Sequence, residues 1–153
     1  MTAGFLDGYL PYLLRQADQT LSEPFYAVLT RYGVARSEWR VLAVLHELGD
    51  LGVVELAAAS LSPQPTVTHA LRRLEDRDLV TRRPGDHDKR QRIISITPSG
   101  AQLTTGLIDE ATALEHDALA DVDDLAALSQ QLRDLTAAIE AQAQTIQMKT
   151  QAG

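Results

Sequence analysis

The sequence predicts a mainly α-helical protein with one small β-hairpin, and three observations support this fold class. Apolar residues recur at helical spacing in several segments of the 153-residue chain. Residues 79–97 instead contain two short strand-like runs around a turn-rich joint. The apolar fraction of 44% is that of a folded protein, and the length fits one domain with helical extensions.

The first helical segment covers about residues 5–32, where apolar residues recur every three or four positions. Pro24 lies within it, and because proline lacks a backbone N–H we expect a kink or a split there. Gly33 is suited to end the segment. Ser37 is the expected N-cap of the next helix, which ends near Gly49 and buries Val41, Leu42, Leu45 and Leu48.

Two shorter helices follow. The first covers about residues 54–60. The second starts at Ser62 and Pro63, a cap followed by a first-turn proline, and ends between Arg77 and Leu79. Its inward face is formed by Val67, Leu71 and Leu74. This leaves a polar outer face, which consists of Gln64, Thr66, Thr68, His69, Arg72 and Arg73.

The hairpin and two long helices complete the chain. Residues 79–83 and 92–97 are the expected strands, and residues 84–91 are the joint. Thr97 and Pro98 start the next helix, which ends at the acidic cluster of residues 121–124. The last helix has a coiled-coil-like stripe that another helix must cover, and we expect a dimer interface at Leu125, Leu128, Leu132, Leu135 and Ile139.

The distribution of charge is more informative than its total. A net charge of −7 by itself argues against a protein that binds nucleic acid. However, eight of the fourteen Lys and Arg residues lie between Arg72 and Arg92. Residues 53–97 carry a net charge of +2, and the remainder carries −9. An acidic body with a basic strip can meet phosphate groups in one orientation only.

The order of helix, turn, helix and basic hairpin in residues 55–97 is that of a winged helix-turn-helix. Arg can bond guanine at two points, Gln can bond adenine in the same way, and a Thr methyl group can touch thymine. For an isolated segment a solvated helix face is the commoner interpretation, but the adjoining hairpin favours double-stranded DNA. The candidate contacts on the second helix are Gln64, Pro65, Thr66, Thr68, His69, Arg72 and Arg73.

The joint of the hairpin supplies a second set of candidate DNA contacts. A narrow minor groove concentrates negative potential and attracts an inserted arginine. The carboxylate of Asp88 is expected to orient the Arg90 guanidinium by a bidentate bond, and Asp86 could act in the same way. A charged loop that keeps the protein soluble is the alternative. The candidate wing residues are Asp88, Lys89, Arg90 and Arg92.

Other classes of function find little support. The chain has no cysteine, which excludes disulfides, thiolate zinc sites and thiol redox sensing. The four histidines have no metal-ligand spacing, and no catalytic constellation or phosphate loop is present, so we expect neither a metal site nor an enzyme. No signal peptide or membrane-length apolar run is found, so a cytoplasmic protein without a membrane partner is expected.

Several motifs between residues 37 and 100 occur together in one known family. They are Ser37-Glu38-Trp39-Arg40-Val41-Leu42, Glu55-Leu56-Ala57, Thr66-Val67-Thr68, Leu74-Glu75, Leu79-Val80, and Asp88-Lys89-Arg90 running into Ile94-Ser95-Ile96-Thr97-Pro98-Ser99-Gly100. As a set they are specific and resemble the MarR family of bacterial transcription regulators. The departures from the family pattern are Pro63-Gln64-Pro65 at the helix start, Asp78 in place of a common Gly, and Pro24.

The resemblance implies a homodimer that binds a pseudo-palindromic operator, usually as a repressor. It also implies a helical dimerisation region, residues 1–36 and 98–150, around a winged helix-turn-helix domain, residues 37–97. The alternative is a winged-helix protein-interaction module that does not bind DNA.

The resemblance further implies release from DNA by a small phenolic or carboxylate effector; no other cofactor is expected. An aromatic floor with one arginine would suit an aromatic acid, although ordinary helix packing is the commoner role for such residues. The candidate effector-binding residues are Tyr9, Tyr12, Arg15, Trp39 and His46.

Overall fold

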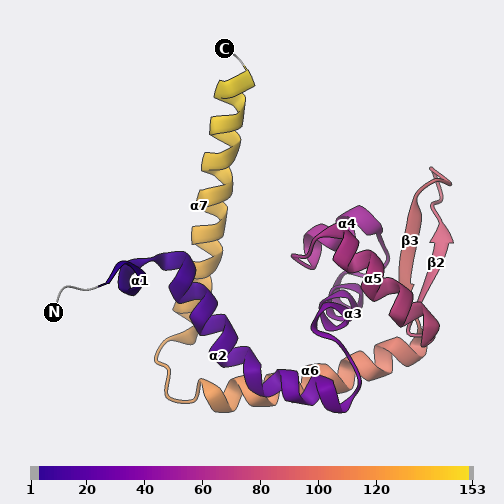
Figure 1. Ribbon diagram of the computed structural model, residues 1–153, viewed down its shortest axis with the longest axis horizontal. Helices are drawn as coiled ribbons and strands as arrows, with labels where there is room; N and C mark the ends of the chain where they lie inside the picture. The colour runs from indigo at the N-terminus through magenta and orange to yellow at the C-terminus, as the bar shows by residue number, and fades with distance from the viewer. Residues whose placement is uncertain (1–3, 152–153) are drawn as a thin grey trace. The chain divides into compact units, whose positions relative to one another are not determined.

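The computed structural model describes residues 4–151, which form helices and a three-stranded sheet (Figure 1). The elements in chain order are α1 (Phe5–Gly8), α2 (Leu10–Arg31), α3 (Arg36–Leu48), β1 (Leu51–Gly52), α4 (Val53–Ala59), α5 (Gln64–Asp76), β2 (Val80–Pro84), β3 (Arg92–Ile96), α6 (Pro98–Ala118) and α7 (Leu125–Gln151). They divide into two compact units, one ending at Glu115 and one beginning at His116. The winged helix-turn-helix order expected from the sequence is confirmed.

Helix α2 does not split at Pro24, so of the kink or split expected there the split is wrong. The helix is continuous from Leu10 to Arg31, and the interruption lies at Tyr9, just before Pro11 in the first turn. The turn that follows Pro24 packs into the core, which offsets the backbone hydrogen bond that proline removes. Its buried residues are Phe25, Val28 and Leu29.

The junction between α2 and α3 is a tight, fully hydrogen-bonded turn. Gly33 adopts the left-handed conformation with φ of 64°, which ends α2 as expected. Its N–H donates to the carbonyl of Thr30, and the N–H of Val34 donates to the carbonyl of Leu29. The N-cap of α3 is Ala35 and not Ser37, because the Glu38 carboxylate accepts the Ala35 N–H at 2.9 Å.

Helix α5 rests on a core to which every element of the winged domain contributes. Its buried residues are the predicted Val67, Leu71 and Leu74, together with Ala70. They pack with the fully buried residues Leu42 and Leu45 of α3, Leu56 of α4, Ile94 of β3 and Leu107 of α6. The N-cap of α5 is Pro63 rather than Ser62, whose hydroxyl donates instead to the Ser60 carbonyl. Pro65 stands in the first turn, where no donor is needed.

The sheet contains one strand more than the sequence predicted. Strand β1 pairs antiparallel with β3, which pairs antiparallel with β2, so that the order is β1-β3-β2. In the wing hairpin Val80 lies opposite Ile96 and Pro84 lies opposite Arg92. The buried Ile94 holds this hairpin on the core.

The base of the wing is joined to the start of α6. The Thr97 hydroxyl accepts the Gly100 N–H at 3.0 Å and donates to the Asp78 carbonyl at 2.7 Å, so Thr97 is the predicted cap of α6. Asp78 has a φ of 55°, a left-handed conformation that aspartate adopts more readily than most residues. The end of α5, the wing hairpin and the start of α6 thus meet at one point.

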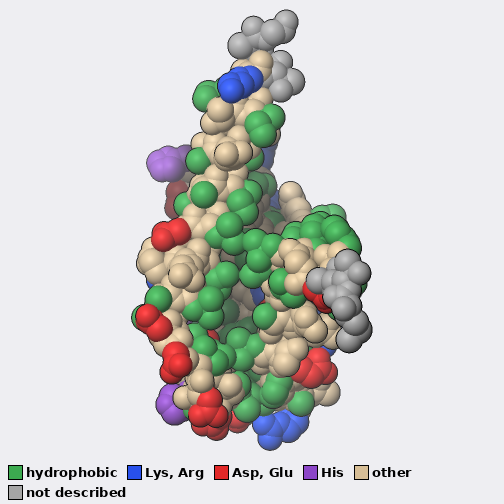
Figure 2. Space-filling view, turned by 90° about the vertical axis from the view of Figure 1, so that its left-hand side faces the viewer, with side chains coloured by type: hydrophobic (Ala, Val, Ile, Leu, Met, Phe, Trp, Pro, Cys, Tyr) green, Lys and Arg blue, Asp and Glu red, His purple; other side chains and the backbone are tan. Residues whose placement is uncertain are grey.

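Helix α7 carries the predicted leucine stripe on its surface. Leu125, Leu128 and Leu132 are 37%, 43% and 42% exposed, and Ile139 is 59% exposed. Figure 2 shows hydrophobic side chains at the surface along this helix, below the grey C-terminal residues. Within the part of the chain that the structure describes, no helix is both long and apolar enough to span a membrane.

Candidate nucleic-acid interface

The outer face of α5 is polar and open to solvent. Gln64, Thr66, His69 and Arg72 are exposed, and Thr68 is half-buried. The Thr68 hydroxyl donates to the Gln64 carbonyl at 2.9 Å. The side chain of Arg72 forms no ion pair with any described residue. A helix whose inner side is fixed in a core and whose outer side is polar can be placed in a major groove without unfolding any part of the domain.

A cleft of about 430 Å³ lies between α5, the start of α4 and the wing. Gln64 and Thr68 of α5 and Arg90 and Arg92 of the wing all line this cleft. Members of both sets of candidate DNA contacts, which come from separate elements of the chain, therefore line one cleft. Glu55 of α4 also lines it, and sequence analysis did not identify this residue as part of the site.

The tip of the wing is ordered by its backbone. The Asp88 carboxylate accepts the backbone N–H of Arg90 at 2.9 Å, and the Asp88 carbonyl accepts the N–H of Gln91. The expected bidentate bond from Asp88 to the Arg90 guanidinium is therefore wrong: Asp88 shapes the turn. The guanidinium of Arg92 donates to the carbonyl of Lys89 at 3.2 Å. The side chains of Lys89 and Arg90 remain exposed, without ion pairs among the described residues.

Three other carboxylate–guanidinium contacts lie at the base of the wing. Arg82 of β2 donates to both carboxylate oxygens of Glu75 on α5, at 3.1 and 2.9 Å. Arg83 contacts Asp86 at 3.1 Å through one oxygen, rather than by the expected bidentate bond, and lies 3.6 Å from Asp50. The bidentate Arg82–Glu75 pair fixes the wing relative to α5, because its planar geometry admits one orientation.

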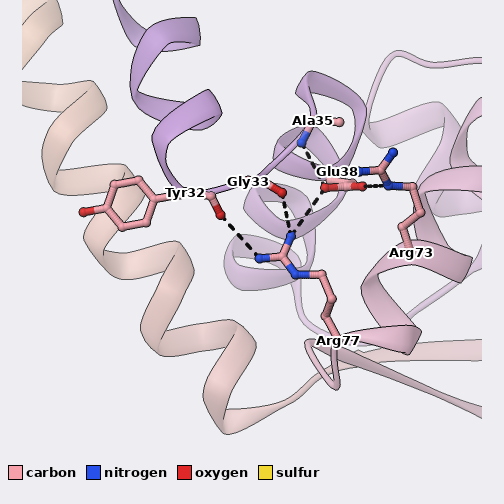
Figure 3. Close-up of polar contacts among 6 residues, drawn as sticks. All are labelled: Tyr32, Gly33, Ala35, Glu38, Arg73 and Arg77. Carbon is pink, nitrogen blue, oxygen red and sulfur yellow. Dashed lines mark hydrogen bonds and ion pairs between the residues drawn. The ribbon is translucent and has the colours of Figure 1, made fainter.

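Arg73 differs from the other candidates on α5. Its Nε lies 2.5 Å from the carboxylate of Glu38, a residue of α3 that is completely buried (Figure 3). Arg77, one helical turn after Arg73, approaches the same carboxylate. Sequence analysis did not identify Arg77 as a functional residue. Both arginine side chains remain partly exposed, at 55% for Arg73 and 39% for Arg77, while their guanidinium groups approach the buried carboxylate.

The candidate effector residues do not form one site. Tyr12 and Arg15 line a shallow depression on α2, and Tyr9 stacks on Phe5 with ring centroids 4.7 Å apart. His46, in the last turn of α3, lines neither this depression nor the one described next.

Trp39 lines a separate depression of about 450 Å³ between α2, α3 and the end of α4. It shares this depression with Arg40, Asp18 and Leu61, of which Leu61 is 88% exposed. The indole also packs edge-on against the Phe25 ring, with ring centroids 4.9 Å apart. Trp39 therefore contacts the core and also lines this depression. Sequence reasoning missed Arg40, which is adjacent to Trp39 and supplies the cation of the depression.

Comparisons with known proteins agree with this architecture. The model of the MarR family matches residues 34–91. A MarR family transcriptional regulator from Silicibacter pomeroyi DSS-3, whose crystal structure is known, is 32% identical; the match covers 90% of this chain and 99% of that one, with a TM-score of 0.79. The HTH-type transcriptional regulator FarR of Neisseria gonorrhoeae is 29% identical over 109 residues, which are 71% of this chain and 74% of FarR.

A structure of BpsR from Bordetella bronchiseptica shares the fold, with a TM-score of 0.77, 22% identity and coverage of 89% of this chain and 98% of that one. That structure concerns the mechanism by which 6-hydroxynicotinic acid regulates the DNA binding of BpsR.

Proposed function

The chain belongs to the MarR family of transcriptional regulators, and on this premise we propose that it is a repressor that binds a pseudo-palindromic operator as a homodimer and is released by a small aromatic acid or phenol. One observation carries the proposal. Gln64 and Thr68 of the polar face of α5 and Arg90 and Arg92 of the wing line the same cleft. A duplex could then receive α5, as the recognition helix, in its major groove and Arg90 in the adjacent minor groove.

The exposed apolar surface supports the homodimer. The leucine stripe of α7 and the residues Phe5, Leu6, Tyr9 and Leu10 of the N-terminal helices leave large apolar side chains exposed to water. Exposed apolar patches mark surfaces that contact other proteins. A second copy is the occupant we propose for them. Two-fold symmetry then places two half-sites one helical turn apart, ~34–36 Å.

The depression at Trp39 supports a small-molecule effector. An indole beside the Arg40 guanidinium offers stacking and a charged hydrogen bond, which together suit a hydroxylated aromatic carboxylate. The regulation of BpsR by 6-hydroxynicotinic acid is a precedent for such a ligand on this fold. The depression lies between α2 and the helix-turn-helix. A bound ligand would therefore change the orientation of the helix-turn-helix relative to α2.

Selection of duplexes from fragmented genomic DNA tests the proposal. The purified protein should enrich fragments that share one palindrome, and footprinting should protect two patches about one helical turn apart. An aromatic acid that raises the melting temperature of the protein should reduce this protection. Fragments without a shared palindrome, or no enrichment in dilute buffer, would favour a winged-helix module that binds protein.

A further inference from the structure

The junction of α2 and α3 is connected to the far end of the recognition helix by one buried carboxylate and two arginines (Figure 3). Glu38 has no exposed surface. Its Oε2 accepts the Ala35 N–H at 2.9 Å and lies 3.8 Å from Nη1 of Arg77, whereas its Oε1 faces Nε of Arg73 at 2.5 Å. No hydrogen bond of good geometry reaches Oε1 from a described residue, so the charge of Arg73 compensates for its burial.

Arg77 extends this connection to the end of α2. Its Nη1 donates to the Gly33 carbonyl at 2.8 Å and its Nη2 donates to the Tyr32 carbonyl at 3.4 Å. These carbonyls lie at the C-terminal end of α2, where the helix dipole attracts a cation. Among the described hydrogen bonds between a side chain and the backbone, only those of Arg77 connect the end of α5 to the end of α2.

The same junction is held on a second side. The guanidinium of Arg36, the first residue of α3, lies 3.6 Å from the centroid of the Tyr26 ring on α2. Helices α2 and α3 are therefore fixed to each other, and Arg77 and Arg73 fix α5 to both. A planar guanidinium that meets a carboxylate and two carbonyls admits one orientation, which lysine could not reproduce.

We propose that Glu38, Arg73 and Arg77 are positioning residues that set the angle between α2 and the recognition helix, and thereby the half-site spacing that the protein accepts. This inference rests on the proposed dimeric DNA-binding function, because α2 belongs to the region that would pair with a second copy. Any rotation of α5 relative to α2 is repeated by the two-fold axis and changes the distance between the two recognition helices. Arg73 is thus reassigned from a DNA contact to a residue that holds α5 in place.

The test compares wild type with Arg77→Lys, Glu38→Gln and Arg72→Ala, the last being a control. Arg72 is the neighbour of Arg73 but faces solvent beside Gln64 and His69, with no contact to Glu38. Each protein selects from a library of duplexes in which two half-sites are separated by every spacing within two base pairs of the wild-type optimum. Affinity for the optimal duplex is then measured at several salt concentrations.

For Arg77→Lys and Glu38→Gln we expect the same half-site sequence but a broader choice of spacing. The ratio of affinities between the best spacing and a spacing one base pair longer should fall about fivefold or more, the lower range of coupling between two sites. The slope of log affinity against log salt should stay that of wild type, because no phosphate contact is lost. Arg72→Ala should show the reverse, with unchanged spacing and a slope reduced by about 1.8, because each of the two copies loses one phosphate contact.

Three outcomes would overturn the inference. In the first, Arg77→Lys keeps the wild-type spacing ratio. In the second, its salt slope falls as that of Arg72→Ala does, which would make Arg77 a phosphate contact. In the third, both variants lose affinity equally at every spacing, which would show a contribution to folding only. If Glu38→Gln does not fold, the result for Arg77→Lys alone decides the test. That variant should still fold, because lysine keeps a positive charge near the buried carboxylate. If wild type selects no paired half-sites, the proposed function itself is at fault.

Discussion

Replacement of Gly100 by alanine should separate the start of α6 from the base of the wing. A Cβ at Gly100 would lie 2.1 Å from the Leu79 carbonyl oxygen and 2.9 Å from Cγ1 of Ile96. The nearer atom belongs to the backbone and cannot turn aside as the end of a side chain can. Since real Cβ contacts below 3.0 Å are essentially absent, one segment must move by nearly 1 Å.

The expected effect is a loss of about 1–2 kcal/mol of unfolding free energy. Overpacking in a well-packed interior costs about 1–3 kcal/mol, and a 2.1 Å contact with a backbone atom belongs in the upper part of that range, at about 2–3 kcal/mol. The better helix propensity of alanine returns about 1 kcal/mol. For a protein of this length each kcal/mol lowers the melting temperature by about 2–4 °C. Because the wing is displaced, affinity for DNA should fall as well.

Gly106→Ala is the matched control, since it makes the same substitution in the same helix. A Cβ at Gly106 meets nothing within 4 Å, so this variant should be more stable than wild type by about 0.4–1 kcal/mol. Urea denaturation and calorimetry of both variants provide the measurement. The reasoning is refuted if Gly100→Ala is as stable as wild type, or if Gly106→Ala loses as much stability.

Further predictions concern the interface, the effector and the dimer. Arg90→Ala should weaken binding to all duplexes, whereas Gln64→Ala should change base preference, both measured by footprinting; unchanged binding by Arg90→Ala would remove the wing from the interface. Arg82→Ala breaks the bidentate bond to Glu75 and should lower DNA affinity while costing at most about 1 kcal/mol of stability, because the pair is partly exposed; equal affinity would show that the wing needs no such link. Arg40→Ala should remove the thermal stabilisation given by aromatic acids and leave DNA affinity intact, and a retained shift would place the effector elsewhere. Leu132→Asp puts a charge in the exposed stripe of α7 and should give a monomer in sedimentation, whereas a persistent dimer would exclude that stripe from the interface.

Local sequence patterns predicted the fold well where the environment of a residue depends on residues close to it in the sequence. The spacing of Val67, Leu71 and Leu74 was sufficient to orient α5, because helical periodicity alone decides which side is apolar. Strand β1 was not predicted, because it has two residues, Leu51 and Gly52, which are too few to show an alternation of apolar and polar side chains. It forms because β3 offers them a partner.

The polar contacts were harder to predict because they join distant segments. Aspartate next to arginine in the wing suggested an ion pair, but Asp88 serves the backbone, and the bidentate pair forms between Arg82 and Glu75. Glu38 and Arg73 are brought together only by the packing of α3 on α5. Without the fold, Arg73, which contacts Glu38, could not be distinguished from Arg72, which does not.

The salt dependence of affinity for duplex DNA tests the central claim most directly. If α5 and the wing of two copies together neutralise about 6–10 phosphates, affinity should fall roughly 10³–10⁵-fold between about 50 and 200 mM salt. The measurement needs no knowledge of the operator, because a non-specific duplex responds in the same way. An affinity that is nearly independent of salt would contradict the account, since the cations of α5 and the wing would then not meet phosphate at all.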